Sequence, residues 1–120
     1  MGNNFIRVND IHALADLISA SKLRPVVVFK HSLTCGVSDA AYRELTAFGG
    51  EVALVEVQTS REVSREIEKR TGVTHESPQV ILLRNGEVVW TASHFAVKAD
   101  AVAAAVAEHS LDGIPTAEME

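Results

Sequence analysis

The sequence is poor in cysteine, because Cys35 is the only one among 120 residues. A single cysteine excludes a disulfide within the chain. It also argues against structural zinc, which needs four ligands with paired close spacings that Cys35 and the histidines His31, His75 and His94 do not provide. We therefore expect no metal site and no bound cofactor. Cys35 is either a reactive thiol or a small buried hydrophobic residue.

Basic residues and long apolar runs are also scarce. Lys and Arg number 11 against 16 Asp and Glu, which gives a net charge of −5, so no basic face is expected for a nucleic acid. No apolar run is long enough to span a bilayer. The opening stretch "MGNNFIRVNDIHALADLI" lacks the basic start and the unbroken apolar stretch of a secretory signal. We expect a cytoplasmic protein without membrane or nucleic-acid partners.

The composition, 47% hydrophobic and 22% charged, is typical of a globular protein. No repeat or low-complexity linker divides the chain, and its length suits one domain. Only the end, "SLDGIPTAEME", is polar, acidic and broken by Gly113 and Pro115. We expect residues 1–109 to form one domain and residues 110–120 to be a flexible acidic tail.

Periodicity predicts alternating helices and strands. Helical patterns follow Asp10 and Ser60, and others cover Cys35–Phe48 and Val97–His109. Apolar β-branched runs predict buried strands at Pro25–Lys30 and Val52–Gln58, and Asn85-Gly86 predicts a hairpin after Pro78. The order helix, β, α, β, α, β, β, α is that of the thioredoxin fold. The expected fold class is α/β, with a central mixed four-stranded sheet flanked by helices.

Cys35 falls where the first buried strand gives way to a helix. The first turn of a helix has backbone N–H groups without intrahelical acceptors and the positive end of the helix dipole, and both favour a thiolate. His31 either assists ionisation of Cys35 or lies at the strand end without a chemical role. This position argues for a reactive thiol, since it lies outside both the apolar strand and the apolar helix face.

Ser38 occupies the place of the second cysteine in a Cys-x-x-Cys site, where an internal thiol would release the substrate. A hydroxyl cannot form a disulfide, so a mixed disulfide on Cys35 must be resolved by another molecule. The Ser38 hydroxyl either donates a hydrogen bond to the Cys35 sulfur or caps a helical N–H.

The segment "THESPQV" supplies the other half of the expected site. A proline just before a strand, in this fold context, favours a cis Ser77-Pro78 bond that exposes backbone beside the cysteine for pairing with an extended substrate. His94 follows the last strand, where it either approaches the site from the far end or faces solvent in a loop.

The stretches "FKHSLTCGVSDAAYREL" and "VTHESPQVILLRNGEVVWTASH" resemble the monothiol bacilliredoxins, the YtxJ-like family of general stress proteins with a thioredoxin-like fold. The resemblance covers about Phe5 to His109. The segment from Thr34 to Ser38 is similar to that family's Thr-Cys-Pro-Ile-Ser site, with Gly36 and Val37 in place of Pro and Ile. His75-Glu76-Ser77-Pro78-Gln79 and Ser93-His94 fall where the family has the same residues.

The resemblance implies removal of bacillithiol from S-thiolated cytosolic proteins under oxidative stress. Cys35 would attack the mixed disulfide, take up bacillithiol as a co-substrate, and be resolved by another thiol. Thr34, Gly36, Val37 and Ser38 would form the motif that stabilises the thiolate. The residues expected to contact the substrate are Ser77, Pro78 and His75, with His31 and His94 as accessory groups.

Two other functions stay open. Cys35-Gly36-Val37-Ser38 is also similar to the Cys-Gly-Phe-Ser site of monothiol glutaredoxins, which bridge an iron–sulfur cluster between two subunits. One cysteine per chain would then demand a dimer and two external thiols, because a cluster needs four thiolates. The third function is a thioredoxin-like binding module that recognises extended peptides beside Pro78 without turnover.

Overall fold

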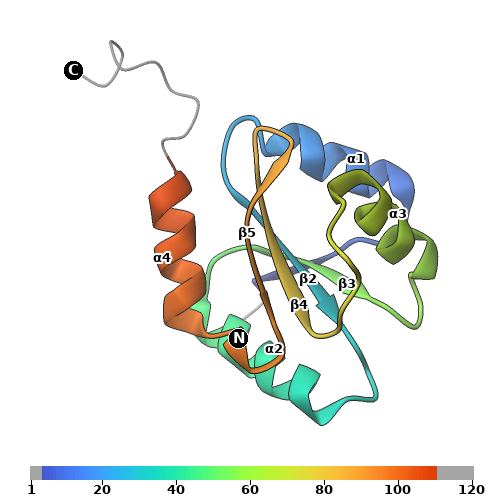
Figure 1. The fold of residues 1–120 in the computed structure, drawn as a ribbon, viewed down its shortest axis with the longest axis vertical. Coiled ribbons are helices and arrows are strands. Elements are labelled where there is room, and N and C mark those ends of the chain that lie inside the picture. Colours follow the sequence, from blue (N-terminus) through green and yellow to red (C-terminus); the bar gives the residue numbers. More distant parts are fainter. Residues whose placement is uncertain (1–3, 111–120) are drawn as a thin grey trace.

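The computed structural model describes residues 4–110. These residues form strands and helices that alternate along the chain and surround one sheet (Figure 1). The elements are β1 (Phe5–Arg7), α1 (Ile11–Ala20), β2 (Val26–His31), α2 (Gly36–Phe48), β3 (Val52–Glu56), α3 (Arg61–Thr71), β4 (Gln79–Arg84), β5 (Glu87–Ser93), a short 3₁₀ turn (His94–Ala96) and α4 (Ala99–His109).

The sheet has the strand order β1-β3-β2-β4-β5, with β2 at its centre. Strands β1, β3 and β2 are parallel, while β4 is antiparallel to β2 and β5 is antiparallel to β4. The prediction of a mixed sheet is confirmed, but the prediction of four strands is wrong by one. The extra strand, Phe5–Arg7, has only three residues and pairs only with β3, so its sequence carries no run long enough to mark it as a strand.

The sheet is buried between two layers of helices, with α2 and α4 on one face and α1 and α3 on the other (Figure 1). Alternate side chains of β2 enter different halves of the core. Val27 and Phe29 pack in one cluster with Leu45 of α2, and Val28 packs in the other with Leu14 of α1. Burial on both faces explains why β2 and β3 are apolar without alternation.

The helix boundaries follow the capping signals in the sequence. The Asp10 carboxylate accepts a hydrogen bond of 2.8 Å from the Ala13 N–H, which caps α1. Gly49 and Gly72 end α2 and α3 with positive φ angles of 77° and 74°. The last helix starts later than predicted, at Ala99, because the 3₁₀ turn and the extended backbone at Lys98 precede it.

Within residues 4–110, no helix is long and apolar enough to cross a bilayer. Most of the predicted acidic tail, residues 111–120, lies outside the described residues.

Candidate functional site

Cys35 is the N-cap residue of α2, at the carboxyl end of the central strand β2. Its backbone is extended, with φ −119° and ψ 123°, and its carbonyl accepts a hydrogen bond of 3.1 Å from the Asp39 N–H. The thiol is free and partly exposed. The side chain is thus accessible beside the unpaired N–H groups of the first helical turn, as the sequence predicts.

Ser38 is fully buried one helical turn further on. Its hydroxyl oxygen accepts a hydrogen bond of 2.9 Å from the Ser32 N–H and lies 2.7 Å from Nδ1 of His31. Both predicted roles of this hydroxyl are wrong among the described residues, because it pairs with the loop before Cys35 rather than with the sulfur or a helical N–H. Ser38 therefore holds that loop against α2.

His31 ends β2 and is buried with its ring against Tyr42, at 5.2 Å between ring centres. Burial lowers the pKa of His31 from its usual 6.5, and the carboxylates of Asp39 and Glu56 oppose this effect only in part. The imidazole is therefore mostly neutral at pH 7. The His31 ring contacts the motif through the Ser38 hydroxyl, which in turn bonds to the loop before Cys35.

The lowered pKa of His31 predicts a loss of stability in acid. Its folded pKa lies below the unfolded value of 6.5, so the unfolded chain binds more protons between those values. The free energy of unfolding should fall as the pH drops from about 6.5 through that window. We expect His31→Asn to flatten this decline in urea titrations from pH 7.5 to 5.0. His12→Asn, at an exposed position of α1, should leave the decline as in the wild type, and an equal effect of both variants would contradict the assignment.

Pro78 lies at the same end of the sheet as Cys35. Lys30 of β2 pairs with Gln79 of β4, which places Pro78 beside His31 in the same register. The Ser77-Pro78 peptide bond is cis, as predicted. The Ser77 hydroxyl is buried and has no hydrogen-bond partner among the described residues, so it is an unused polar group in this loop.

His94 and His75 flank the Pro78 loop on different sides. The His94 N–H donates a hydrogen bond of 2.9 Å to the Pro78 carbonyl, and its Nε2 lies within hydrogen-bond distance, 2.7 Å, of an exposed Glu76 oxygen. The side chain of His75 instead turns toward β2 and α3, where its Nδ1 lies 3.1 Å from the Lys30 ammonium nitrogen. The structure therefore gathers Cys35, Ser38, His31 and Pro78 at one edge, with the two other histidines at its margins.

Lys30 and His75 form a partly buried polar contact that the sequence did not reveal. Lys30 has no exposed surface, and burial lowers the pKa of its ammonium while the Glu68 carboxylate opposes that shift. Burial and the neighbouring ammonium also lower the pKa of His75. Glu68 accepts a hydrogen bond of 2.7 Å from the His75 N–H, and this anchors the Pro78 loop to α3.

Gln58, just after β3, organises the loop before Cys35 and was also missed. Its amide oxygen accepts a hydrogen bond of 3.0 Å from the Leu33 N–H, and its amide nitrogen donates to the hydroxyls of Ser32 at 2.9 Å and Thr34 at 3.3 Å. The signal was present in the sequence, because polar residues at the carboxyl ends of adjacent parallel strands meet at one edge of a sheet.

Gly36 and Val37 occupy the first turn of α2 after Cys35. A side chain at Gly36 would meet no atom within 4 Å, so packing does not demand glycine there. Glycine does retain a backbone N–H beside the thiol, which proline would remove.

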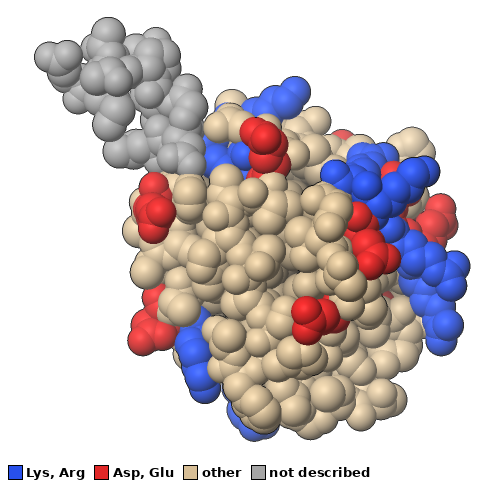
Figure 2. All heavy atoms as spheres, in the orientation of Figure 1, with Lys and Arg blue, Asp and Glu red and all other residues tan. Residues whose placement is uncertain are grey.

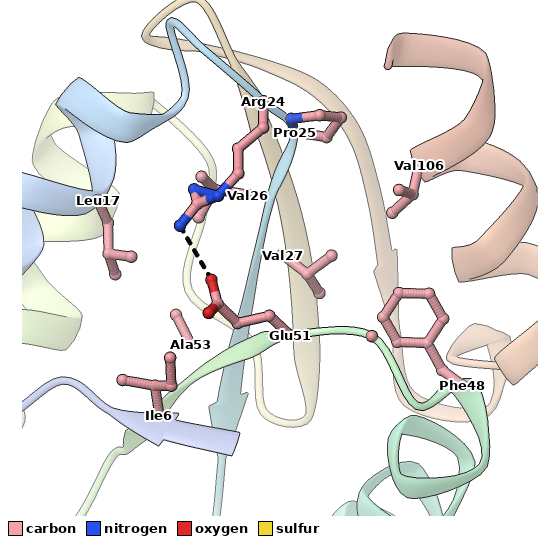
Figure 3. Close-up of a pocket in the computed structure, with 11 residues that line it drawn as sticks. Ile6, Leu17, Arg24, Pro25, Val26, Val27, Phe48, Glu51, Ala53 and Val106 are labelled. Atoms are coloured by element: carbon pink, nitrogen blue, oxygen red, sulfur yellow. Dashed lines mark hydrogen bonds and ion pairs between the residues drawn. The ribbon is translucent and has the colours of Figure 1, made fainter. Parts of the chain in front are cut away.

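A largely apolar hollow lies at the other end of the sheet (Figure 3). It has a volume of about 130 Å³ between Pro25, Phe48 and Val106, and the Arg24–Glu51 ion pair of 3.0 Å crosses it. Since Pro25 precedes β2 and Cys35 follows it, this hollow is not part of the cysteine site. Among residues 4–110, no group of three or more His, Cys, Asp or Glu side chains is placed to hold a metal ion.

Comparisons with known proteins agree with this geometry. The family model of the monothiol bacilliredoxin BrxC matches residues 6–102. A solved structure described as a candidate oxidoreductase with a thioredoxin fold is 34% identical, with a TM-score of 0.77, and the match covers 84% of this chain and 92% of that one.

More distant solved structures share the fold. Thioredoxin from Fasciola hepatica is 18% identical, with a TM-score of 0.67 over 87% of this chain and 98% of that one. Thioredoxin NaTrxh from Nicotiana alata is 18% identical, with a TM-score of 0.71 over 92% and 96%. These two structures show the thioredoxin fold, while the family match and the 34% identical oxidoreductase indicate thiol redox chemistry. The chain belongs to the monothiol bacilliredoxin family.

Proposed function

We propose that this protein is a monothiol thiol-disulfide oxidoreductase that removes bacillithiol, or a similar low-molecular-weight thiol, from mixed disulfides on cytosolic proteins. The observation that supports it best is the contrast between the two ends of the motif. The Cys35 thiol is partly exposed at a helix start, whereas the Ser38 hydroxyl is fully buried and holds the loop. The site thus has one accessible sulfur and no internal group that can displace a substrate from it.

The reaction is two successive exchanges. The Cys35 thiolate attacks the bacillithiol sulfur of the mixed disulfide, forms a Cys35–bacillithiol disulfide, and releases the client protein as a thiolate. A second thiolate from solution or another protein then attacks the bacillithiol sulfur and releases Cys35. Backbone N–H groups at the α2 N-terminus stabilise the Cys35 thiolate as attacking and leaving group.

Residues around Pro78 would position the client. The backbone beside the cis Ser77-Pro78 bond offers hydrogen bonds to an extended segment. Leu33, which is 50% exposed and two residues before Cys35, adds an apolar contact on the other side. We assign Thr34, Gly36 and Val37 to the surroundings of the thiolate, Ser38 to holding the loop before Cys35, and Ser77, Pro78 and His75 to the substrate side.

Intact-mass measurement tests the exchange. Oxidised bacillithiol should add one bacillithiol mass to the wild type and none to Cys35→Ser, whose fold is checked by circular dichroism. A client protein carrying bacillithiol on one cysteine should lose it to the wild type but not to the variant. A wild type that takes up no adduct from any small disulfide would overturn the proposal.

The two other functions give different results. A cluster carrier would become a brown dimer after anaerobic reconstitution with glutathione or bacillithiol, whereas the exchange function predicts a colourless protein. A binding module would bind its partners equally well after Cys35→Ser and would leave the thiolated client unchanged.

A further inference from the structure

A second pocket adjoins the cysteine site on the α3 side. It has a volume of about 380 Å³ and lies between the end of β3, α3 and the loop that carries His75. We name it the α3 pocket, and its lining residues are Val57, Gln58, Arg61, Ser64, Arg65, Glu68 and His75. Most of these side chains are polar, in contrast to the apolar hollow of Figure 3 at the far end of the sheet.

The arginines of the α3 pocket are not neutralised by the protein. Within residues 4–110, Arg7, Arg24 and Arg70 each lie within 3.0 Å of a glutamate, but no carboxylate pairs with Arg61 or Arg65. Figure 2 shows Lys and Arg side chains, with Asp and Glu side chains among them, at the side of the molecule where α3 lies. Unpaired guanidinium groups are suited to a carboxylate, which they bind through two parallel hydrogen bonds.

The remaining charges of the α3 pocket do not cancel this excess. Glu68 is the single carboxylate among the lining residues, and it accepts a hydrogen bond from the His75 N–H. It also interacts electrostatically with the buried ammonium of Lys30, which does not line the pocket. His75 contacts Lys30 directly, at 3.1 Å. Among the residues that line the pocket, two are arginines and one is a glutamate, so the pocket favours an anion.

One residue that lines the α3 pocket is hydrogen-bonded to the loop before Cys35. Gln58 lines the pocket and bonds to Ser32, Leu33 and Thr34, the three residues before Cys35. On the other side, His75 is three residues before Pro78. A ligand bonded to Cys35 would therefore reach the pocket by extending along the loop that Gln58 holds.

We propose that the α3 pocket binds the carboxylate end of an acidic low-molecular-weight thiol while its sulfur is bonded to Cys35, with Arg61 and Arg65 as the ligands of the carboxylate. This inference rests on the proposed function and adds its substrate class. Bacillithiol, which ends in a malyl dicarboxylate, and glutathione, which carries two carboxylates, both have the required chemistry.

The test compares acidic and neutral disulfides on the same thiol. Rates of adduct formation on Cys35 are measured by quenched mass spectrometry with oxidised bacillithiol, glutathione disulfide and uncharged hydroxyethyl disulfide, at low ionic strength. Dividing the rate with an acidic disulfide by the rate with the uncharged disulfide corrects for any change in the intrinsic reactivity of Cys35. We expect the double variant Arg61→Gln/Arg65→Gln to lower this ratio about tenfold for at least one acidic disulfide, and the larger decrease identifies which thiol the pocket takes.

Lys69→Gln is the matched control, because it removes a positive charge from the same helix outside the α3 pocket. It should leave the ratio within about twofold of the wild type, since an exposed charge outside the pocket acts only through screened solvent. An unchanged ratio in the arginine variant, or an equal loss in Lys69→Gln, would overturn the inference while leaving the proposed function intact. No adduct with any disulfide would instead mean that the proposed function itself has failed.

A binding measurement gives a readout that does not depend on exchange. S-methylglutathione and S-methyl bacillithiol, which cannot react, are titrated into ¹⁵N-labelled Cys35→Ser protein. We expect at least one of them to shift the side-chain amide resonances of Gln58, and the shift to be lost with the two arginine substitutions. Shifts confined to other parts of the molecule would contradict the placement.

Discussion

Replacing Ser38 with cysteine should allow the protein to resolve its own mixed disulfide. In the wild type the mixed disulfide on Cys35 should persist until an external thiol attacks it. Cys35 is the N-cap of α2 and residue 38 lies three positions later, one helical turn away, with its hydroxyl against Ser32 and His31 of the segment before Cys35. A thiolate introduced at position 38 would attack the Cys35 sulfur, form an internal disulfide with it and release the small thiol. Intramolecular attack by a well-oriented group should exceed resolution by millimolar external thiol by at least about a hundredfold.

His31 strengthens this expectation. Its Nδ1 lies 2.7 Å from the Ser38 oxygen, and the lowered pKa keeps the ring neutral near pH 7. A neutral imidazole at that distance can accept the proton that a thiol must lose before it attacks. In the wild type the His31 imidazole lies next to the Ser38 hydroxyl, which cannot attack the Cys35 disulfide even with a base beside it.

The measurement starts from protein loaded with one glutathione or bacillithiol on Cys35 and freed of excess thiol. The wild-type adduct should persist, whereas Ser38→Cys should lose it and appear as a species lighter than the reduced protein by two hydrogens. Ser38→Ala is the control, because it removes the same hydrogen bonds to His31 and Ser32 without adding a thiol. Its adduct should persist as in the wild type, and an adduct equally stable in Ser38→Cys would refute the internal geometry.

The sequence predicted the elements whose physical signals are local. Buried parallel strands are apolar on both faces, Asn85-Gly86 tolerates the positive φ of a tight hairpin, and Asp10 supplies a carboxylate where a helix starts. Strand β1 was not predicted, because its three residues are too few to show a periodicity and the strand depends on pairing with β3.

The site was predicted where one residue type is diagnostic and missed where partners come from distant segments. The position of Cys35 and the cis bond at Pro78 followed from fold context. The contacts of Ser38 with His31, of Gln58 with the cysteine loop, and of Lys30 with His75 join residues 7, 24 to 26 and 45 positions apart. The sequence of one segment does not specify its partner in another, and for Gln58 it indicates only that polar residues at the ends of adjacent parallel strands meet at one edge of the sheet.

Arg84 is the clearest example of such a distant contact, and its loss should cause the largest fall in stability. It ends β4 and is 3% exposed, yet no carboxylate pairs with it among the described residues. Its guanidinium donates to the carbonyls of His109 at 3.0 Å, Ser21 at 3.0 Å and Ser110 at 3.4 Å. These carbonyls lie at the C-terminal ends of α1 and α4, on opposite faces of the sheet.

The ends of helices explain how a buried cation is tolerated there. The last carbonyls of a helix have no intrahelical donor and carry the negative end of the helix dipole, so they take the place of a counter-ion. Arg84→Met would keep much of the volume but remove these three hydrogen bonds and the positive charge beside the two helix ends, and the Ser21 carbonyl would keep the Asn85 N–H as its donor. Since hydrogen bonds to charged groups contribute about 1.5–3 kcal/mol each and do not add fully, we expect the free energy of unfolding to fall by roughly 3 kcal/mol.

Urea unfolding followed by circular dichroism measures this change. Arg24→Met is the matched control, since the Arg24–Glu51 pair is about half exposed and its loss should cost less than about 1 kcal/mol. Arg84→Lys should fall between the two, because an ammonium keeps the charge but cannot reach carbonyls of both helices with a planar fork. If Arg84→Met were no more destabilising than Arg24→Met, the two helix ends would be held by packing alone, and the guanidinium would not be the group that joins the two faces of the sheet.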